Sequence, residues 1–369
     1  MKKYRVGIIG HTGQGNYGHG LDTVWKNFPD QFDIVGLADA HADAVNAAVE
    51  RTGAAKGFTD YHKMLKETRP EILAICPRWI DRHHEYAMAA AEHGCHVFIE
   101  KPFCPTLEQA DEIVREFEMR HLKLCIAYQS HYSPILDAAK KLIADGAIGE
   151  PLEIRGRGKE DGRGGGEDLW VLGSHVLDLF RDFCGNVATC RAEMFENGKP
   201  VTKANVKQGN EGLGPLAGDE IHAEYTFKDS RVRGYFSSVR NRGGSPSRFG
   251  LQIFGSQGII DFYTNYLTPA FILRDSSWSP GRTDKKWEPI SSNGIGQPET
   301  LPNAGPHGGN MATVLDLVSA IEQDRPTRCN IEDARASQEM ILGVFESHRQ
   351  GGNPVTFPLE NRKHPLAML

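Results

Sequence analysis

The chain has 369 residues, of which 24% are charged and 39% hydrophobic, and its formal net charge is −6. This slightly acidic composition, with a mean hydropathy of −0.44, argues against a nucleic-acid-binding surface, and the length predicts two domains. The first apolar run, at 6–9, is too short for a signal peptide or a membrane helix. Seven cysteines without CxxC spacing fit reduced thiols, so we expect a cytoplasmic protein with no membrane or nucleic-acid partner.

The first predicted elements are a buried strand at 5–9, a glycine-rich loop at 10–20 and apolar residues with helical spacing at 21–28. Strand, glycine loop and helix in this order are the context of a dinucleotide fingerprint, in which the backbone and a helix N-terminus approach a pyrophosphate. A literal GxGxxG begins only at Gly13, so the loop is longer than the usual fingerprint. We assign Gly10, Thr12 and Gly13 to the cofactor phosphates, and we expect His11 between them to contact the cofactor as well.

A second predicted strand, at 32–38, ends in Asp39. An acidic residue at this point is placed to bind the ribose hydroxyls of the adenosine. Residues 40–43 contain no arginine for a 2′-phosphate, which favours NAD over NADP as the cofactor. The alternative for Asp39 is a helix N-cap.

Helices and strands alternate in the prediction as far as residue 128. Helices are expected at 42–52, 61–67, 81–93 and 106–118, and strands at 71–76, 97–99 and 123–128. Such alternation predicts a parallel, doubly wound sheet in a first domain over 1–128.

Lys101 lies directly after a predicted buried strand and directly before Pro102. Proline restricts the preceding residue to extended conformations, so this lysine is held at a strand end. Ligands of open α/β sheets bind outside the carboxyl ends of the strands. We therefore expect Lys101 to reach a substrate oxygen and to exchange a proton if it is partly desolvated. The alternative is a surface lysine paired with Glu100.

The pattern changes after residue 128. Strands with alternating polarity are expected at 152–158, 221–227, 231–239, 251–254 and 258–262, with helices at 134–144, 310–323 and 331–350 and a last strand at 355–359. Glycine-, proline- and serine-rich loops are expected at 161–166, 207–218, 241–247 and 276–309. Alternation predicts a mostly antiparallel sheet, and so a second α/β domain over 129–369.

A metal site is not predicted. The run His83, His84 and Glu85 lacks HExxH spacing and has no companion ligands in the sequence.

In chain order, the residues resemble the glucose–fructose oxidoreductase / inositol dehydrogenase / MocA (Gfo/Idh/MocA) family. The resemblance is carried by the glycine loop, Asp39, Cys76-Pro77 with His83, Glu100-Lys101-Pro102, Gly-Ala-Ile-Gly-Glu-Pro at 146–151 and Gly-Ser-His-Val-Leu-Asp at 173–178. It implies an N-terminal Rossmann domain and a C-terminal α/β domain whose large open sheet serves substrate binding and often oligomer contacts. It also implies NAD(P)-linked oxidation or reduction of a sugar or polyol hydroxyl.

Site residues follow from this resemblance. Lys101 matches the lysine that contacts substrate and cofactor, and His175 matches the acid/base histidine. Gln129 stands where the family often has an asparagine near the nicotinamide ribose. The resemblance further implies that Pro77, His83 and Glu100 belong to the cofactor pocket. It also implies that Trp170 and Asp178 belong to the substrate site.

One position departs from the family pattern. An aspartate often lies four residues before the histidine, and here that position is Val171. Either Asp168 takes the role or the chemistry differs from simple polyol dehydrogenation. The preceding run contains Arg155, Arg157 and Arg163, which we expect to bind an anionic substrate from a flexible loop. The alternative for these arginines is a charged edge of the sheet.

Three functions therefore remain open. The leading one is an NAD-dependent oxidoreductase that acts on a sugar hydroxyl, in a homo-oligomer formed through the C-terminal sheet. The second is an NAD-dependent glycosidase that passes through a transient ketone without net oxidation. The third is a non-catalytic NAD-binding sensor.

Overall fold

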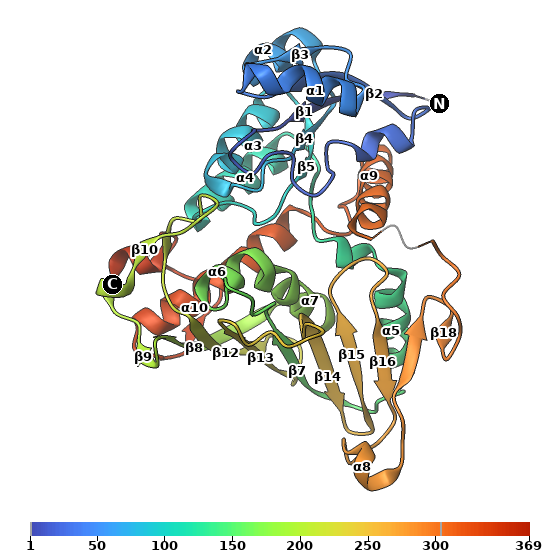
Figure 1. The fold of residues 1–369 in the computed structure, drawn as a ribbon, viewed down its shortest axis with the longest axis vertical. Helices are drawn as coiled ribbons and strands as arrows, with labels where there is room; N and C mark the ends of the chain where they lie inside the picture. The colour runs from blue at the N-terminus through green and yellow to red at the C-terminus, as the bar shows by residue number, and fades with distance from the viewer. Residues whose placement is uncertain (1, 303–304) are drawn as a thin grey trace. The chain divides into compact units, whose positions relative to one another are not determined.

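The computed structural model describes residues 2–302 and 305–369. Its chain divides into two compact units (Figure 1). The first unit comprises Met1–Gln129, Asn210–Gly214 and Pro306–Arg335, and the second comprises Ser130–Gly209, Pro215–Gly305 and Ala336–Leu369. Within the described residues, the helices are all too short or too polar to cross a membrane.

The first unit contains a six-stranded parallel sheet in the order β3-β2-β1-β4-β5-β6. Its strands are β1 (Tyr4–Ile9), β2 (Phe32–Ala38), β3 (Gly57–Phe58), β4 (Ile72–Ile75), β5 (His96–Ile99) and β6 (Leu124–Ile126). Chain order reverses between β1 and β4, and a doubly wound sheet binds ligands at such a point. The predicted parallel, doubly wound sheet is confirmed.

Four helices of the first unit follow the prediction, namely α1 (Ala42–Thr52), α2 (Tyr61–Thr68), α3 (His83–Glu92) and α4 (Leu107–Met119). The hydroxyl of Thr106 accepts a hydrogen bond from Gln109 N and so caps α4. A fifth helix, α9 (Pro306–Glu322), comes from far along the chain and buries Val314 and Leu317 in the same core as Trp25. The first unit therefore takes in residues beyond the range 1–128.

The helix expected at 21–28 is wrong. Residues 21–23 form a turn, and only a 3-10 helix, η1 (Val24–Asn27), follows. Pro29 disfavours the helical conformation for Phe28, and the indole N–H of Trp25 donates to the carbonyl of Leu21 at 2.8 Å. The glycine loop therefore leads into no α-helix N-terminus that would attract a pyrophosphate.

The second unit is built on an eleven-stranded sheet in the order β18-β17-β16-β15-β14-β7-β13-β12-β8-β19, with β9 beside β8. Its main strands are β7 (Pro151–Arg157), β8 (Val187–Glu196), β12 (Glu220–Phe227), β13 (Arg233–Val239), β14 (Gly250–Gly255), β15 (Gly258–Tyr263), β16 (Ala270–Leu273) and β17 (Glu288–Ser291). Short strands complete it: β9 (Lys199–Pro200), β18 (Gly294–Ile295) and β19 (Val355–Thr356). Only the β7–β13 pair is parallel among the described pairings of this sheet, so the mostly antiparallel prediction is confirmed.

Helix α7 (Ser174–Cys184) covers one face of this sheet. A Cβ at Gly156 of β7 would meet Val176 and Phe180 of this helix. Because neighbouring residues of a strand point to opposite faces, Arg155 and Arg157 lie on the face away from α7. The remaining helices are α5 (Pro134–Ala144), α8 (Pro280–Thr283) and α10 (Ile331–Arg349), and the last of these runs from one unit into the other.

Candidate active site

The glycine loop of the first unit is closed on itself. His11 and Asn16 form an antiparallel bridge, and the Asn16 side chain accepts the N–H of Gly13 at 3.0 Å. Gly13 has a φ of +82°, which favours glycine over residues with a side chain. The ring of Tyr17 packs on Gly10, where any Cβ would clash with it. The loop is therefore rigid, and it brings Gly10 and Thr12 to the carboxyl end of β1.

Asp39 is fixed by this loop. Its Oδ2 accepts the hydroxyls of Thr12 and Tyr17, each at 2.7 Å, and its Oδ1 accepts the backbone N–H of His41 at 2.9 Å. Burial opposes ionisation, but these donors outweigh it, so the pKa of Asp39 lies below its ordinary value. The residue is only 1% exposed, and donors of the protein already occupy most of its lone pairs. In this structure Asp39 holds the glycine loop and presents almost no surface to a ribose.

A cavity of about 360 Å³ opens beside Asp39 within the first unit. Its lining includes Gly10, Tyr61, Arg82 and Tyr86. Burial raises the pKa of Tyr86 to about 12, so this phenol stays neutral. Small residues, aromatic rings and a nearby carboxylate at the strand ends fit the adenosine part of a dinucleotide.

Arg82 is the arginine that the sequence around Asp39 lacked. Its Nε donates to Glu85 at 2.9 Å and its Nη2 to the same carboxylate at 2.5 Å. The Tyr61 hydroxyl also donates to Glu85, at 2.6 Å. The guanidinium of Arg82 thus lines the cavity while its charge is paired with Glu85, three residues further along the chain.

Lys101 follows β5 and is 8% exposed. Its backbone N–H donates to Oε2 of Glu100 at 2.9 Å, and this carboxylate is completely buried. The other oxygen, Oε1, accepts the backbone N–H of His19 at 2.9 Å and lies 2.6 Å from His19 Nδ1. Burial opposes ionisation of Glu100, but the contacts with His19 and the charge of Lys101 outweigh it and lower its pKa. A buried carboxylate therefore fixes the start of the Glu-Lys-Pro segment.

Gln129 joins the same network. Its Nε2 donates to Asn310 Oδ1 at 3.2 Å, and Asn310 Nδ2 donates to the carbonyl of His19 at 3.0 Å. A Cβ at Gly309 would meet the Gln129 side chain, so α9 packs closely against it. The chain Gln129–Asn310–His19–Glu100 fixes side chains from four separate segments of the first unit.

His83 is fully buried and connects two loops. Its Nε2 lies 2.7 Å from the carbonyl of Pro77, after β4, and its Nδ1 lies 2.9 Å from the carbonyl of Pro102, after β5. Burial lowers the pKa of His83 even though these carbonyls favour the charged ring. The side chain has no exposed surface in this structure. It positions the loops that carry Pro77 and Lys101.

His175 lies in the first turn of α7 in the second unit. It is half-buried while the residues that follow it, from Val176 to Phe180, are buried, so the imidazole has access to solvent. Its ring meets that of Phe249 edge-on, with centroids 6.3 Å apart. The segment before it is a π-helical turn, η4 (Leu169–Gly173), that buries Val171. Such turns are frequent at functional sites.

Three predicted site residues of the second unit have internal roles instead. Asp168 accepts the Ser238 hydroxyl at 2.5 Å and the backbone N–H groups of residues 159 and 160, and is fully buried. Burial raises the pKa of Asp168. Asp178 is 1% exposed, and its Oδ2 lies 2.7 Å from His131 Nε2. The indole of Trp170 is fully buried and stacks near His364. In this structure these side chains are buried and make internal contacts.

The three predicted substrate arginines are not brought to His175. Arg155 and Arg157 point away from α7, and Arg163 pairs with Asp161 through Nη2 at 2.6 Å. The flexible basic loop over the active site is wrong, because β7 continues through Arg157 and fixes two of these side chains on the other face of the sheet.

Residue types alone did not reveal Tyr17, His19 and Arg82. His19 lies next to Gly18 in the glycine loop, and its role depends on a carboxylate that is 81 residues away in the sequence. Sequence spacing carries no signal for such a contact.

The chain matches two family models. Residues 4–128 match "Oxidoreductase family, NAD-binding Rossmann fold", and residues 140–357 match "Oxidoreductase family, C-terminal alpha/beta domain" of the same family.

Among curated proteins, levoglucosan dehydrogenase of Pseudarthrobacter phenanthrenivorans is 25% identical over 251 residues, which are 61% of this chain and 64% of that protein. Glycosyl hydrolase family 109 protein 1 of Akkermansia muciniphila is 26% identical over 183 residues, which are 45% of this chain and 37% of that protein. The chain thus spans less than two thirds of the length of each.

A solved structure titled levoglucosan dehydrogenase, complex with NADH and levoglucosan, has the same fold. It superposes with a TM-score of 0.76 at 19% identity and covers 97% of this chain and 100% of that chain. By both domain models, the chain belongs to the Gfo/Idh/MocA oxidoreductase family, with an NAD-binding Rossmann domain followed by the C-terminal alpha/beta domain of that family.

Proposed function

We propose that the protein is an NAD-dependent oxidoreductase that acts on a hydroxyl of a sugar or sugar derivative. A bound NAD would supply the hydride acceptor for oxidation of the carbinol carbon to a ketone. Lys101 hydrogen-bonds and polarises the reacting oxygen, and His175 or Lys101 takes the hydroxyl proton. Residues 1–128 hold the cofactor and residues 129–369 bind the sugar.

The observation that carries this proposal is the fixed position of Lys101 at the end of β5. The backbone N–H of Lys101 donates to the buried carboxylate of Glu100, and His83 contacts the carbonyl of the next residue, Pro102. Both contacts restrain the segment that carries Lys101, and an acid/base group that is already in position needs little reorganisation during the reaction. The similarity to a levoglucosan dehydrogenase supports a hydroxyl of a sugar or sugar derivative as the reacting group.

A second candidate is an NAD-dependent glycosidase. In this cycle a sugar hydroxyl is oxidised, the acidified neighbouring C–H is deprotonated, the aglycone is eliminated, water adds and the ketone is reduced. Val171 favours this candidate, because it stands where dehydrogenases of the family often have an aspartate that orients a substrate hydroxyl. The similarity to a family 109 glycosyl hydrolase favours it as well.

One experiment separates the two reactions. The enzyme is incubated with NAD and a panel of sugars, polyols and nitrophenyl glycosides, and both NADH and released nitrophenol are followed. NADH that accumulates in step with ketone, with the glycosidic bond intact, supports the oxidoreductase. Nitrophenol release with catalytic NAD and no net NADH supports the glycosidase. Binding of NAD without formation of NADH or nitrophenol would contradict both enzymatic functions and would favour a non-catalytic NAD-binding sensor.

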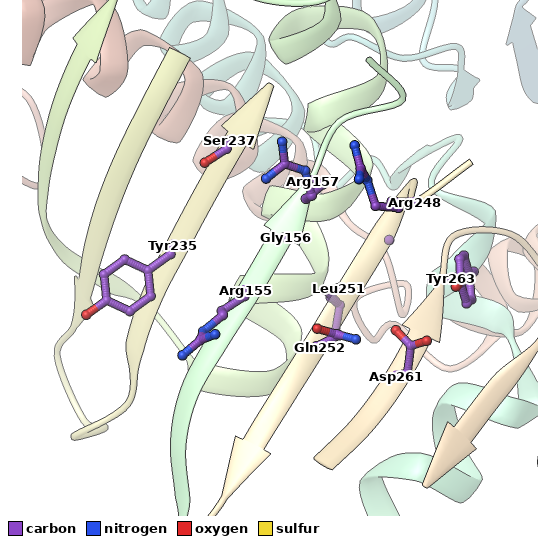
Figure 2. A pocket seen from close by; sticks show the side chains of 11 residues that line it. Arg155, Gly156, Arg157, Tyr235, Ser237, Arg248, Leu251, Gln252, Asp261 and Tyr263 are labelled. Carbon is purple, nitrogen blue, oxygen red and sulfur yellow. The ribbon is translucent and has the colours of Figure 1, made fainter. Parts of the chain in front are cut away.

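We also propose a homo-oligomer formed through the open face of the eleven-stranded sheet, in the cytoplasm. Tyr235 of β13, which is exposed and lies on this face beside Arg155 (Figure 2), supports the contact, and seven buried cysteine thiols without disulfides support a reducing compartment. Sedimentation velocity tests the assembly: a species of one chain at micromolar concentration would contradict it.

A further inference from the structure

The glycine loop after β1 uses most of its backbone donors inside the protein. A loop of this kind normally binds a pyrophosphate through free backbone N–H groups and through the N-terminus of the helix that follows. Here the N–H groups that donate to oxygens of the protein are those of Gly10, His11, Thr12, Gly13, Gln14, Asn16, Gly18 and His19. The helix that follows is only the short 3-10 helix η1. The cofactor phosphates therefore need another positive partner close to this loop.

The glycine loop spans the point where chain order reverses in the sheet. A Cβ at Gly13 would lie 3.9 Å from Nε2 of His41, after β2, whereas a Cβ at Gly15 would clash with the backbone of Arg78, after β4. The backbone N–H of Arg78 donates to the carbonyl of Gly15 at 3.3 Å. A dinucleotide crosses a doubly wound sheet at such a point. The part of the loop beside Arg78 therefore lies on the path from the cavity beside Asp39 to the ends of β4 and β5.

The guanidinium of Arg78 is loosely paired. The side chain is 40% exposed, and its ion pair among the described residues joins Nη2 to Oε1 of Glu211 at 3.9 Å. This distance is too long for a hydrogen bond, so the guanidinium keeps donors for another acceptor. Arg82, by contrast, donates twice to the carboxylate of Glu85. Since arginine forks match phosphate oxygens, Arg78 is equipped to bind a phosphate beside the glycine loop.

Glu211 belongs to a short segment, Asn210–Gly214, that is part of the first unit, while the chain on either side of it is part of the second. The backbone carbonyl of Glu211 accepts the N–H of Ile80 at 3.0 Å. Leu213 of the same segment is fully buried. Both contacts fix the segment, and they hold the Glu211 carboxylate close to Arg78, in the place that an anionic ligand of this arginine would take.

We propose that Arg78 binds the pyrophosphate of NAD and that Glu211 competes with this pyrophosphate for the guanidinium. Arg78 then supplies the positive charge that the N-terminus of a longer helix after β1 would otherwise supply. The inference deepens the proposed function, because it names a ligand of the cofactor, and it rests on the NAD-binding part of that function.

Calorimetric titration of the full-length protein with NAD measures this contact without turnover. Arg78→Gln should lower the affinity for NAD about 10- to 100-fold, because it removes charge-assisted hydrogen bonds to phosphate. Arg115→Gln is the matched control, since Arg115 is also exposed and also has a loose ion pair, at 4.0 Å to Glu116 on α4. Equal affinity for NAD in the parent and Arg78→Gln, or an equal loss in Arg115→Gln, would overturn the proposal.

Two further probes locate the contact on the phosphates. ADP-ribose carries the pyrophosphate without the nicotinamide, and adenosine carries no phosphate; each is measured by competition against NAD. Arg78→Gln should weaken the binding of ADP-ribose as much as that of NAD and leave that of adenosine unchanged. Weakening of all three by the same factor would show that the variant disturbs the loop, and would overturn the phosphate contact. If the parent binds no NAD, the proposed cofactor fails, and the role of Arg78 fails with it.

Glu211→Gln tests the competing carboxylate. Loss of its charge should raise the affinity for NAD about two- to fivefold, which is the range of an exposed ion pair, and leave that for adenosine unchanged. Added to Arg78→Gln, the same substitution should leave the affinity for NAD unchanged, because the guanidinium is absent. An affinity that does not rise in Glu211→Gln, or that rises equally when Arg78 is already replaced, would overturn the competition.

Discussion

Nδ1 of His19 lies 2.6 Å from Oε1 of Glu100, and Oε2 of the same carboxylate accepts the backbone N–H of Lys101 at 2.9 Å. The contact joins the glycine loop after β1 to the segment after β5. The buried carboxylate of Glu100 thus connects the glycine loop to Lys101, the proposed catalytic lysine.

Glu100→Gln tests this relationship through the stability of the fold. The amide loses the charge that His19 and the Lys101 N–H stabilise, so we expect the free energy of unfolding to fall by about 1–3 kcal/mol near pH 7. Because the native pKa of Glu100 is lowered, its contribution is complete above the unfolded value of about 4.3 and is lost as the pH falls through the lower native pKa.

The measurement is urea unfolding of parent and variant from neutral to acidic pH. The difference between them should shrink as the pH falls below about 4. Glu360→Gln, at an exposed position outside the helices and strands, is the control and should match the parent. A difference that stays constant with pH would contradict the role of the charge.

His83→Ala should act on turnover through Lys101. Without the ring, the loops after β4 and β5 lose their common partner, so we expect kcat to fall at least about tenfold with a smaller change in KM. His84→Ala is the matched control, since its ring is on the same helix and contacts Glu112 near the surface. Equal kinetics in the two variants would show that His83 does not position the lysine.

Tyr17→Phe distinguishes two roles for Asp39. If the carboxylate holds the glycine loop, as its contacts indicate, loss of the Tyr17 hydroxyl should weaken NAD binding about three- to tenfold by calorimetry. If Asp39 instead binds the ribose directly, the variant frees a lone pair and the affinity for NAD should stay the same or rise.

Glu85→Gln concerns the choice between NAD and NADP. In the parent, Glu85 pairs with Arg82, so we expect NAD to bind more tightly than NADP. The variant leaves the guanidinium of Arg82 without its carboxylate partner, so it can pair with the 2′-phosphate of NADP. The preference for NAD, measured as the Kd for NADP divided by the Kd for NAD, should therefore fall about tenfold. Glu92→Gln, exposed on the same helix, should leave the ratio unchanged. An unchanged ratio in Glu85→Gln would remove Arg82 from cofactor selection.

The sheets could be predicted because their hydrophobic patterns are local. The continuous apolar run of β4 and the alternation along β13 each determine burial within a few residues. The strand β8 was missed, because its alternation is interrupted by half-buried residues at both ends. The place of α9 could not be predicted, since only packing against Trp25 shows which core that helix joins.

The site could be predicted only in part. The position of Lys101 follows from a strand and a proline, and these are adjacent in sequence. Whether Arg155 and Arg157 face α7 depends on strand parity relative to a helix elsewhere in the chain, so the loop prediction failed there. The burial of Asp168 under Ser238 is likewise a long-range contact, 70 residues apart.

Transfer of deuterium tests the central claim most directly. Sugars and polyols carrying deuterium on their carbinol carbons are incubated with NAD and parent enzyme, and the recovered nicotinamide is examined for label at C4 by mass spectrometry. We expect label with at least one substrate and a loss of about 10²- to 10⁴-fold in its rate in Lys101→Met, which lacks the acid/base group. Absence of label with every substrate, or an undiminished rate in Lys101→Met, would contradict the account.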